Sequence, residues 1–191
     1  MRKKESKKEM ILNAATSLFA HKEFHLVGMD DVAKKAKVAK GTLYNYFKSK
    51  EDLYFSILKT RLNTLVNSLK ESYNANENAW NNLKRYIERI HKFMTSNPYF
   101  FMILKKEEPI LEKKKKIEIK STIDTLKETI HKVFIKGVKE RTFRIETANE
   151  LVTDLVLSMT DTVIKRDLKY NDKTKAVETF LGFLSTIILV N

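Results

Sequence analysis

Hydroxyl, amide and ammonium groups gather in one short stretch of the sequence, between Val38 and Phe47. If this stretch is a helix, Val38, Leu43 and Phe47 can point inward and leave its other side polar. The outward side chains are then those of Lys40, Thr42, Tyr44, Asn45 and Tyr46, followed by Lys48 and Lys50. Such groups meet phosphate oxygens and base edges of nucleic acids. Taken alone, the stretch fits an ordinary polar surface helix equally well.

Two more helices are predicted before this stretch, which is too short to form a helix without tertiary packing. Ser6 and Glu9 have the spacing of a capping box, and the apolar residues from 10 to 19 recur at helical spacing. Gly28 stands where a second, short helix begins, with Asp30 and Asp31 in its first turn. Three helices with a small shared core are typical of a helix-turn-helix, although a generic three-helix bundle has the same pattern.

The charge is uneven along the 191 residues. The formal net charge is +13, from 37 basic and 24 acidic residues. Residues 1–50 hold 12 Lys and Arg against 5 Asp and Glu, a net +7, and the other 141 residues hold the remaining +6. This bias favours a polyanionic partner for the N-terminal part, although a membrane surface or solubility alone would also explain it.

The composition predicts an all-α protein, because there are only 4 Gly and 2 Pro and no long alternating runs. With no Cys, disulfides and thiolate metal sites are excluded. The basic N-terminus is not followed by an apolar core, and the apolar segment 180–190 is about half as long as a membrane span. We therefore expect a cytoplasmic protein that does not enter a membrane.

Residues 10–58 resemble the DNA-binding domain of the TetR family of bacterial transcriptional regulators. The resemblance rests on Ile11-Leu12, Ala14-Ala15, Leu18-Phe19, Phe24, Met29, Val32-Ala33, Ala36, Val38, Gly41-Thr42-Leu43-Tyr44, Tyr46-Phe47 and Ser49-Lys50-Glu51 with Leu53. It implies that Val38–Phe47 is the recognition helix. Thr42 and Tyr44 would then contact DNA, Tyr46 and Lys50 would contact phosphates, and Lys40 and Asn45 would tune the operator sequence.

Three positions depart from the family pattern. Glu23 replaces the usual turn glycine, Gly28 replaces the Ser or Thr that caps the second helix, and Lys37 replaces a glycine before Val38. Gly28 can still cap the helix and offer its backbone N–H to a phosphate. Lys37 can add a phosphate contact, but a positive φ there would suit it less well than glycine.

The rest of the chain predicts a helical body. Ser49 is a candidate N-cap for a long fourth helix that ends before the polar segment 74–78. A helix of this length can transmit movement between the DNA-binding domain (the head) and the rest of the chain (the body). The alternative is a plain core helix. Asn97-Pro98 should start a sixth helix, buried nearly all round, and Pro109 a seventh. The Thr147–Glu150 spacing predicts a capping box for the eighth helix, and Asn171-Asp172 a cap for the ninth. The predicted architecture is a helix-turn-helix domain at 1–48 and an effector-binding and dimerisation domain at 49–191, about nine helices in all.

Aromatic and aliphatic residues on the inner stripes of the body either form its core or line an effector pocket. The family's habit of binding small molecules in this domain favours a pocket for an apolar or aromatic effector. The candidate residues are Tyr86, Ile90, Phe93, Phe101, Leu126, Ile130 and Met159. His91, Asp154 and Asp161 are polar residues that can lie near this pocket or, equally well, face solvent.

The last helix is apolar on more than one face, so it needs cover beyond its own core or is buried wholly within the monomer. The resemblance implies that the last two helices form a homodimer interface, so that two heads read a palindromic duplex. The candidate interface residues are Leu151, Leu155, Phe180, Phe183, Leu184, Ile187 and Ile188.

No motif predicts an enzyme, since there is no phosphate-binding loop and the four His residues are scattered. We expect no metal and no cofactor. The favoured interpretation is a homodimeric repressor that a small-molecule effector releases from a palindromic operator. The alternatives are a DNA-associated helical scaffold controlled by a protein partner, and a basic helical protein acting at anionic membranes.

Overall fold

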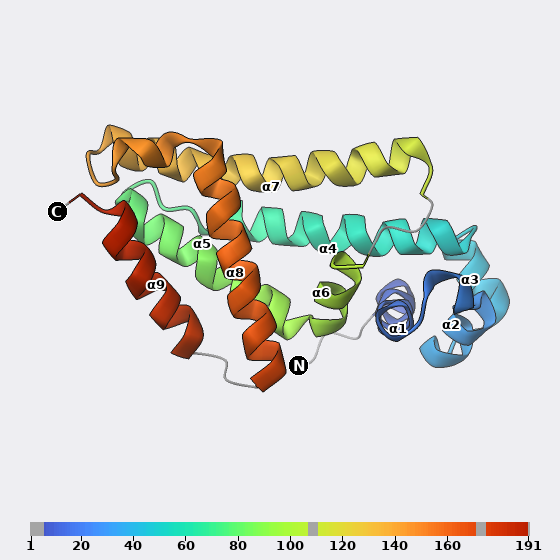
Figure 1. Ribbon diagram of the computed structural model, residues 1–191. Coiled ribbons are helices and arrows are strands. Elements are labelled where there is room, and N and C mark those ends of the chain that lie inside the picture. The colour runs from blue at the N-terminus through green and yellow to red at the C-terminus, as the bar shows by residue number, and fades with distance from the viewer. Residues whose placement is uncertain (1–5, 107–110, 171–174, 191) are drawn as a thin grey trace. The chain divides into compact units, whose positions relative to one another are not determined.

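The computed structural model describes residues 6–106, 111–170 and 175–190 (Figure 1). Over these ranges the regular structure is helical, with one isolated bridge between Phe143 and Leu189. The α-helices are α1 (Lys7–His21), α2 (Met29–Ala36), α3 (Lys40–Tyr46), α4 (Lys50–Ser72), α5 (Ala79–Ser96), α6 (Pro98–Leu104), α7 (Lys113–Lys139), α8 (Glu150–Tyr170) and α9 (Lys175–Ile188). Short 3₁₀ helices, η1 (Phe24–Leu26) and η2 (Ile145–Ala148), precede α2 and α8. The predicted all-α class is confirmed.

The chain divides into two compact units. The first unit comprises residues 1–62 and 99–120, and the second comprises 63–98 and 121–191. Helices α4 and α7 each contribute to both units. Whether residues 1–48 form a domain on their own stays a prediction. No helix in the described part of the chain is long and apolar enough to cross a membrane.

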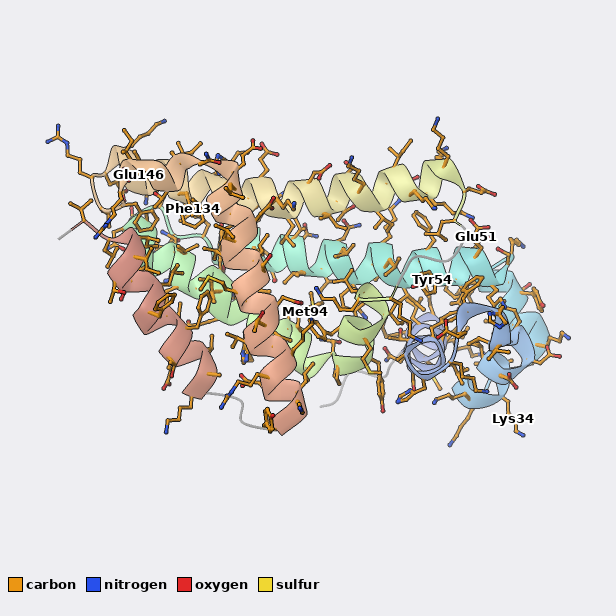
Figure 2. The ribbon with its side chains drawn as sticks, in the orientation of Figure 1. Lys34, Glu51, Tyr54, Met94, Phe134 and Glu146 are labelled. Atoms are coloured by element: carbon orange, nitrogen blue, oxygen red, sulfur yellow. The ribbon has the colours of Figure 1, made fainter. Side chains whose placement is uncertain are left out.

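The core of the first unit joins α1, η1 and the beginning of α4. The Tyr54 ring packs edge-on against the rings of Phe19 and Phe24, with centroid distances of 5.0 and 5.5 Å (Figure 2). Ile11 on α1 and Val32 on α2 are also fully buried in this unit. Burial in this apolar centre stabilises the short helices η1 and α2, which would not persist in water by themselves.

The N-caps predicted at Ser6 and Ser49 are confirmed, but the full capping box predicted at Ser6 is not. The Ser6 hydroxyl accepts a hydrogen bond from the Glu9 N–H at 3.2 Å, and the Ser49 hydroxyl accepts one from the Asp52 N–H at 3.0 Å. The second half of the predicted capping box at Ser6 is wrong. The Glu9 carboxylate instead pairs with Arg61 at 2.7 Å, because a guanidinium 52 residues away offers a charged partner.

Two other expectations also need correction. In α6, Phe100, Phe101 and Ile103 are buried, but Tyr99 and Met102 are exposed, so the helix is not buried all round. At the start of α8, Thr147 belongs to η2 and donates to the Arg144 carbonyl; the Asn149 side chain accepts from the Leu151 N–H instead. The expected caps at Pro109 and Asn171-Asp172 lie outside the described residues, and α7 and α9 are described from Lys113 and Lys175.

In the second unit, a buried asparagine organises the turn between α4 and α5. The fully buried Asn82 side chain accepts from the Asn74 N–H at 2.8 Å and donates to the Asn74 carbonyl at 2.9 Å. Arg85 pairs with Glu77 in the same turn at 2.6 Å. The polar segment that was predicted to end the fourth helix is therefore held in place by side chains of α5.

The second unit also contains a close packing contact that requires glycine. Phe134 and Phe143 lie with ring centroids 5.8 Å apart, and Phe134 is buried within the unit (Figure 2). A Cβ atom on Gly137 of α7 would overlap the Phe143 ring, so a larger residue cannot occupy this position without displacing the ring.

Candidate nucleic-acid interface

The turn between α2 and α3 sets the direction of the candidate recognition helix. Lys37 has φ 55° and ψ 42°, which is the left-handed conformation. Its N–H donates to the Lys34 carbonyl at 3.2 Å, and the Val38 N–H donates to the Ala33 carbonyl at 3.0 Å. Lys37 therefore has the positive φ that would suit glycine better, although the sequence alone did not predict the sign of this angle. Because Val38 is used to close the turn, α3 begins only at Lys40 and ends at Tyr46, which is shorter than the predicted Val38–Phe47.

Helix α3 has a buried side and a polar exposed side, as predicted. Leu43 is fully buried and Phe47, directly after the helix, is almost so. Tyr44 and Tyr46 are 38 % and 46 % exposed. Lys40, Asn45 and Lys48 are also exposed, whereas Thr42 is half-buried. Exposed phenol, amide and ammonium groups on a helix that is held by its opposite face are suited to entering a DNA groove.

An acidic residue of α2 neutralises one cation of this surface. The Lys40 ammonium lies 2.8 Å from the Asp30 carboxylate, and both side chains are exposed. The hydrogen bond and the charge of Asp30 raise the pKa of Lys40 above its ordinary value. Because exposed pairs are weak, a DNA phosphate can compete with Asp30 for this ammonium.

Lys50 occupies a less accessible place than Lys37 or Lys48. Its ammonium donates to the His25 carbonyl at 3.2 Å and lies 4.7 Å from the centre of the Phe24 ring. Lys50 thus ties the start of α4 to η1, a role that sequence reasoning did not anticipate. The Lys50 side chain is half-buried, and its contact with a DNA phosphate stays a prediction.

Gly28 caps α2 with its backbone. Its N–H lies 3.4 Å from the Asp31 carboxylate, so the donor that was expected to meet a phosphate faces a carboxylate in this structure.

Lys34, which sequence reasoning missed, lies exposed on α2 (Figure 2). It stands three residues before Lys37, and that spacing could have pointed to it.

The candidate effector residues are mostly core. Tyr86, Ile90, Phe101 and Ile130 are buried, and the other three candidates, Phe93, Leu126 and Met159, are half-buried. Phe101 belongs to the first unit and the other candidates to the second.

One cavity of the second unit, of about 410 Å³, includes one of these candidates. Its lining consists of Lys70, Tyr73, Tyr86, Thr129, Lys132 and Val133. The lining combines two lysine side chains with aromatic and aliphatic residues, and the Lys132 ammonium is paired with Glu128 at 2.9 Å. Burial raises the pKa of the Tyr86 phenol above its ordinary value. The two lysines had not been singled out, because only folding brings α4 and α7 residues to one cavity.

The polar candidates of the body have separate places. Asp154 lines another cavity, of about 310 Å³, and pairs with Lys127 at 2.7 Å. Asp161 pairs with Lys165 at 2.9 Å. The His91 ring nitrogen lies 2.7 Å from the Asp167 carboxylate, deep in the unit. These three residues do not converge on the lysine-containing cavity.

The candidate dimer residues separate into two groups. Leu151 and Leu155 on α8, and Phe183 and Ile187 on α9, are large apolar side chains that are about half exposed or more. Phe180, Leu184 and Ile188 are buried within the chain. The exposed four are therefore available to a partner, whereas the buried three belong to the core of the second unit.

Comparison with known proteins gives a consistent result. Residues 11–57 match the family model described as bacterial regulatory proteins, tetR family. The chain is 23 % identical over 175 residues to the fatty acid metabolism regulator protein of Bacillus subtilis, a match that covers 90 % of each chain. It is 23 % identical over 117 residues to the HTH-type transcriptional activator FasR of Mycolicibacterium smegmatis, covering 61 % of this chain and about half, 53 %, of that protein.

The fold is shared with a solved regulator. The structure of FadR from Bacillus subtilis in complex with stearoyl-CoA superimposes with a TM-score of 0.73 at 18 % identity, covering 93 % of this chain and 97 % of that chain. At this identity the likeness concerns the fold.

Proposed function

We propose that this protein, whose N-terminal region belongs to the TetR family of bacterial regulatory proteins, is a homodimeric repressor that binds a palindromic operator and leaves it when an effector binds. The observation that carries the proposal is the exposed polar side of α3, held by Leu43 and Phe47 and oriented by the Lys37 turn. A helix presented in this way can read base edges while flanking lysines contact phosphates.

Dimerisation is supported by the apolar side chains that α8 and α9 leave exposed. Leu151, Leu155, Phe183 and Ile187 would lose this exposure against a second copy. A two-fold arrangement presents two copies of α3 to one duplex, which is the reason for proposing a palindromic operator.

The effector we propose is an acyl compound with an apolar chain and an anionic head. The relative solved with stearoyl-CoA supports this class, and the cavity between Lys70 and Lys132 provides cations beside apolar surface. Binding of the effector must favour a conformation in which the two DNA-binding domains no longer fit the operator. A ligand shifts the equilibrium between two conformations only as far as its affinities for them differ.

The test is a mobility-shift titration with the DNA upstream of the protein's own gene. We expect sequence-specific retention that is lost on adding stearoyl-CoA but not on adding coenzyme A alone. A Lys70→Glu/Lys132→Glu variant should need more stearoyl-CoA for release, whereas a Lys92→Glu/Lys139→Glu variant should respond like the wild type. Retention indifferent to sequence would refute the regulator, and undiminished binding with stearoyl-CoA would refute this effector class.

The direction of regulation needs a separate measurement, because one relative is a transcriptional activator. A reporter under the bound promoter should be more active when the gene for this protein is deleted. Lower reporter activity in the deletion strain would replace the repressor by an activator and leave DNA binding intact.

A further inference from the structure

A stripe of lysines begins helix α7. Lys113, Lys116 and Lys120 are spaced i, i+3 and i+7, so they lie along one face of the helix, and all three are exposed. Within the described ranges, these three side chains form no ion pair. The residue between them on the same face is Ile117, which is 58 % exposed. We call Lys113, Lys116 and Lys120 the lysine stripe.

The lysine stripe is electrostatically unfavourable for the isolated helix. The first turn of α7 has no acidic residue, and cations there oppose the positive end of the helix dipole. Like charges at i, i+3 and i, i+4 also repel each other. Helix stability therefore does not account for these residues, but a bound polyanion would remove both costs.

Contacts inside the first unit fix the start of α7 beside the start of α4. The Lys115 ammonium lies 2.7 Å from the Asp52 carboxylate and 3.3 Å from that of Glu51. The Glu51 carboxylate also accepts the Glu112 N–H at 2.8 Å. One turn further along, Lys59 pairs with Glu118 at 2.6 Å. The carboxylates of Glu51 and Asp52 at the start of α4 are thus both paired with Lys115, and that of Glu51 also accepts the Glu112 N–H.

The start of α7 is thus attached to the part of α4 that directly follows the candidate DNA-binding lysines. Lys48 and Lys50 directly precede the acidic residues that Lys115 neutralises. The lysine stripe belongs to the same compact unit as α3. Cations that are carried rigidly next to the start of α4 are placed to meet the backbone of the same duplex, outside the part that α3 reads.

We propose that the lysine stripe contacts phosphates that flank the operator and lengthens the DNA footprint beyond the helix-turn-helix. This inference rests on the proposed function, because it assumes that α3 reads the duplex. Duplex DNA is favoured over a membrane because the stripe carries a single exposed apolar side chain, whereas interfacial helices bury a continuous apolar face.

The test compares Lys113→Gln/Lys116→Gln/Lys120→Gln with a control of equal charge, Lys84→Gln/Lys92→Gln/Lys139→Gln, which changes exposed lysines of the second unit. Fluorescence anisotropy is measured over a range of salt concentrations. One duplex contains only the site mapped by footprinting, and a second adds about one helical turn, roughly 10 base pairs, on each side. A third, of the longer length, has random sequence.

We expect the stripe variant to bind the longer duplexes about tenfold or more weakly, with the slope of log K against log salt reduced by about 2–3 per protomer. Its affinity for the short duplex and the affinities of the control variant should stay near the wild-type values. Equal losses for both variants, or an equal loss on short and long duplexes, would overturn the proposal.

Two further outcomes separate this inference from the function on which it rests. Equal wild-type affinity for mapped and random sequences would refute the operator-binding regulator, yet the random duplex would still report the contribution of the stripe. Binding to vesicles of about one third anionic lipid that disappears in the stripe variant, with DNA affinity unchanged, would assign the stripe to a membrane and overturn the DNA contact.

Discussion

Helix α3 in the first unit and helices α5 and α8 in the second place polar side chains in opposite environments. Most of the candidate functional groups on α3 are exposed. In the second unit, the buried side chains of His91 and Asp167 are hydrogen-bonded to each other, and the buried Asn82 side chain is hydrogen-bonded to Asn74 in the turn before α5. A polar group that is exposed is available to a ligand, whereas one that is buried must be satisfied internally and so contributes to stability. The difference predicts that substitutions will affect binding in one unit and folding in the other.

The largest effect on stability is expected for Asp167→Ala in the second unit. This change leaves the buried His91 ring without its acceptor, which should lower the free energy of unfolding by about 2–4 kcal/mol. Chemical denaturation measures the loss. Asp154→Ala on the same helix breaks only a half-exposed pair with Lys127 and should cost less than about 1 kcal/mol. Equal costs for the two variants would contradict the importance of burial.

In the first unit, Tyr44→Ala should weaken operator binding by about 1–3 kcal/mol while changing the free energy of unfolding by less than about 0.5 kcal/mol. Tyr99→Ala removes a similarly exposed ring from the same unit but outside α3, and should leave DNA affinity unchanged. Anisotropy titrations and denaturation curves on the same preparations separate the two quantities. Wild-type affinity of the Tyr44 variant would remove this residue from the interface.

Left-handed residues provide a direct comparison of the units, because each unit has one non-glycine example among its described residues: Lys37 with φ 55° and Arg141 with φ 57°. Replacing either residue by glycine should stabilise the protein by about 1 kcal/mol, since glycine adopts this conformation without steric cost. Only Lys37→Gly should also weaken DNA binding and lower its salt dependence. If Arg141→Gly weakened binding equally, the phosphate contact proposed for Lys37 would be unsupported.

The smallest effect concerns Lys115 and pH. Its hydrogen bond lowers the pKa of Asp52 below the ordinary value. Because the folded-state pKa is the lower one, the pair stabilises the fold above the unfolded pKa of about 3.9, and this contribution is lost as the pH falls through the folded pKa. Lys115→Met should therefore cost less than about 1 kcal/mol at pH 7, and the difference from wild type should shrink below pH 4. Lys113→Met, which removes a lysine without such a pair, should show no such pH dependence.

Much of the helical framework was predictable because its signals are local. The Ser6 and Ser49 caps, the apolar stripe of α4 and the start of α6 at Pro98 depend on residues within about one turn of each other. The positive φ of Lys37 was not predicted, because a lysine gives no local signal for the left-handed conformation that the turn between α2 and α3 imposes.

The candidate sites were predictable only where exposure follows from helical periodicity. That reasoning placed Leu43 on the buried face of α3 and Tyr44 on its exposed face. It failed for Thr147, where a 3₁₀ turn shifted the cap of α8 to Asn149, since local propensities allow more than one start within a few residues.

The sequence alone therefore determined the helical class, the approximate position of the short helix α3 and the basic character of the N-terminal region, since all three depend on composition and short-range spacing. Tertiary structure decided which partner each long side chain takes: Arg61 for Glu9, His25 for Lys50, and Asp52 for Lys115. It also decided that Phe180, Leu184 and Ile188 are core while Phe183 and Ile187 stay exposed. These choices depend on groups far apart in the chain, and periodicity within one helix carries no information about what packs against each of its faces.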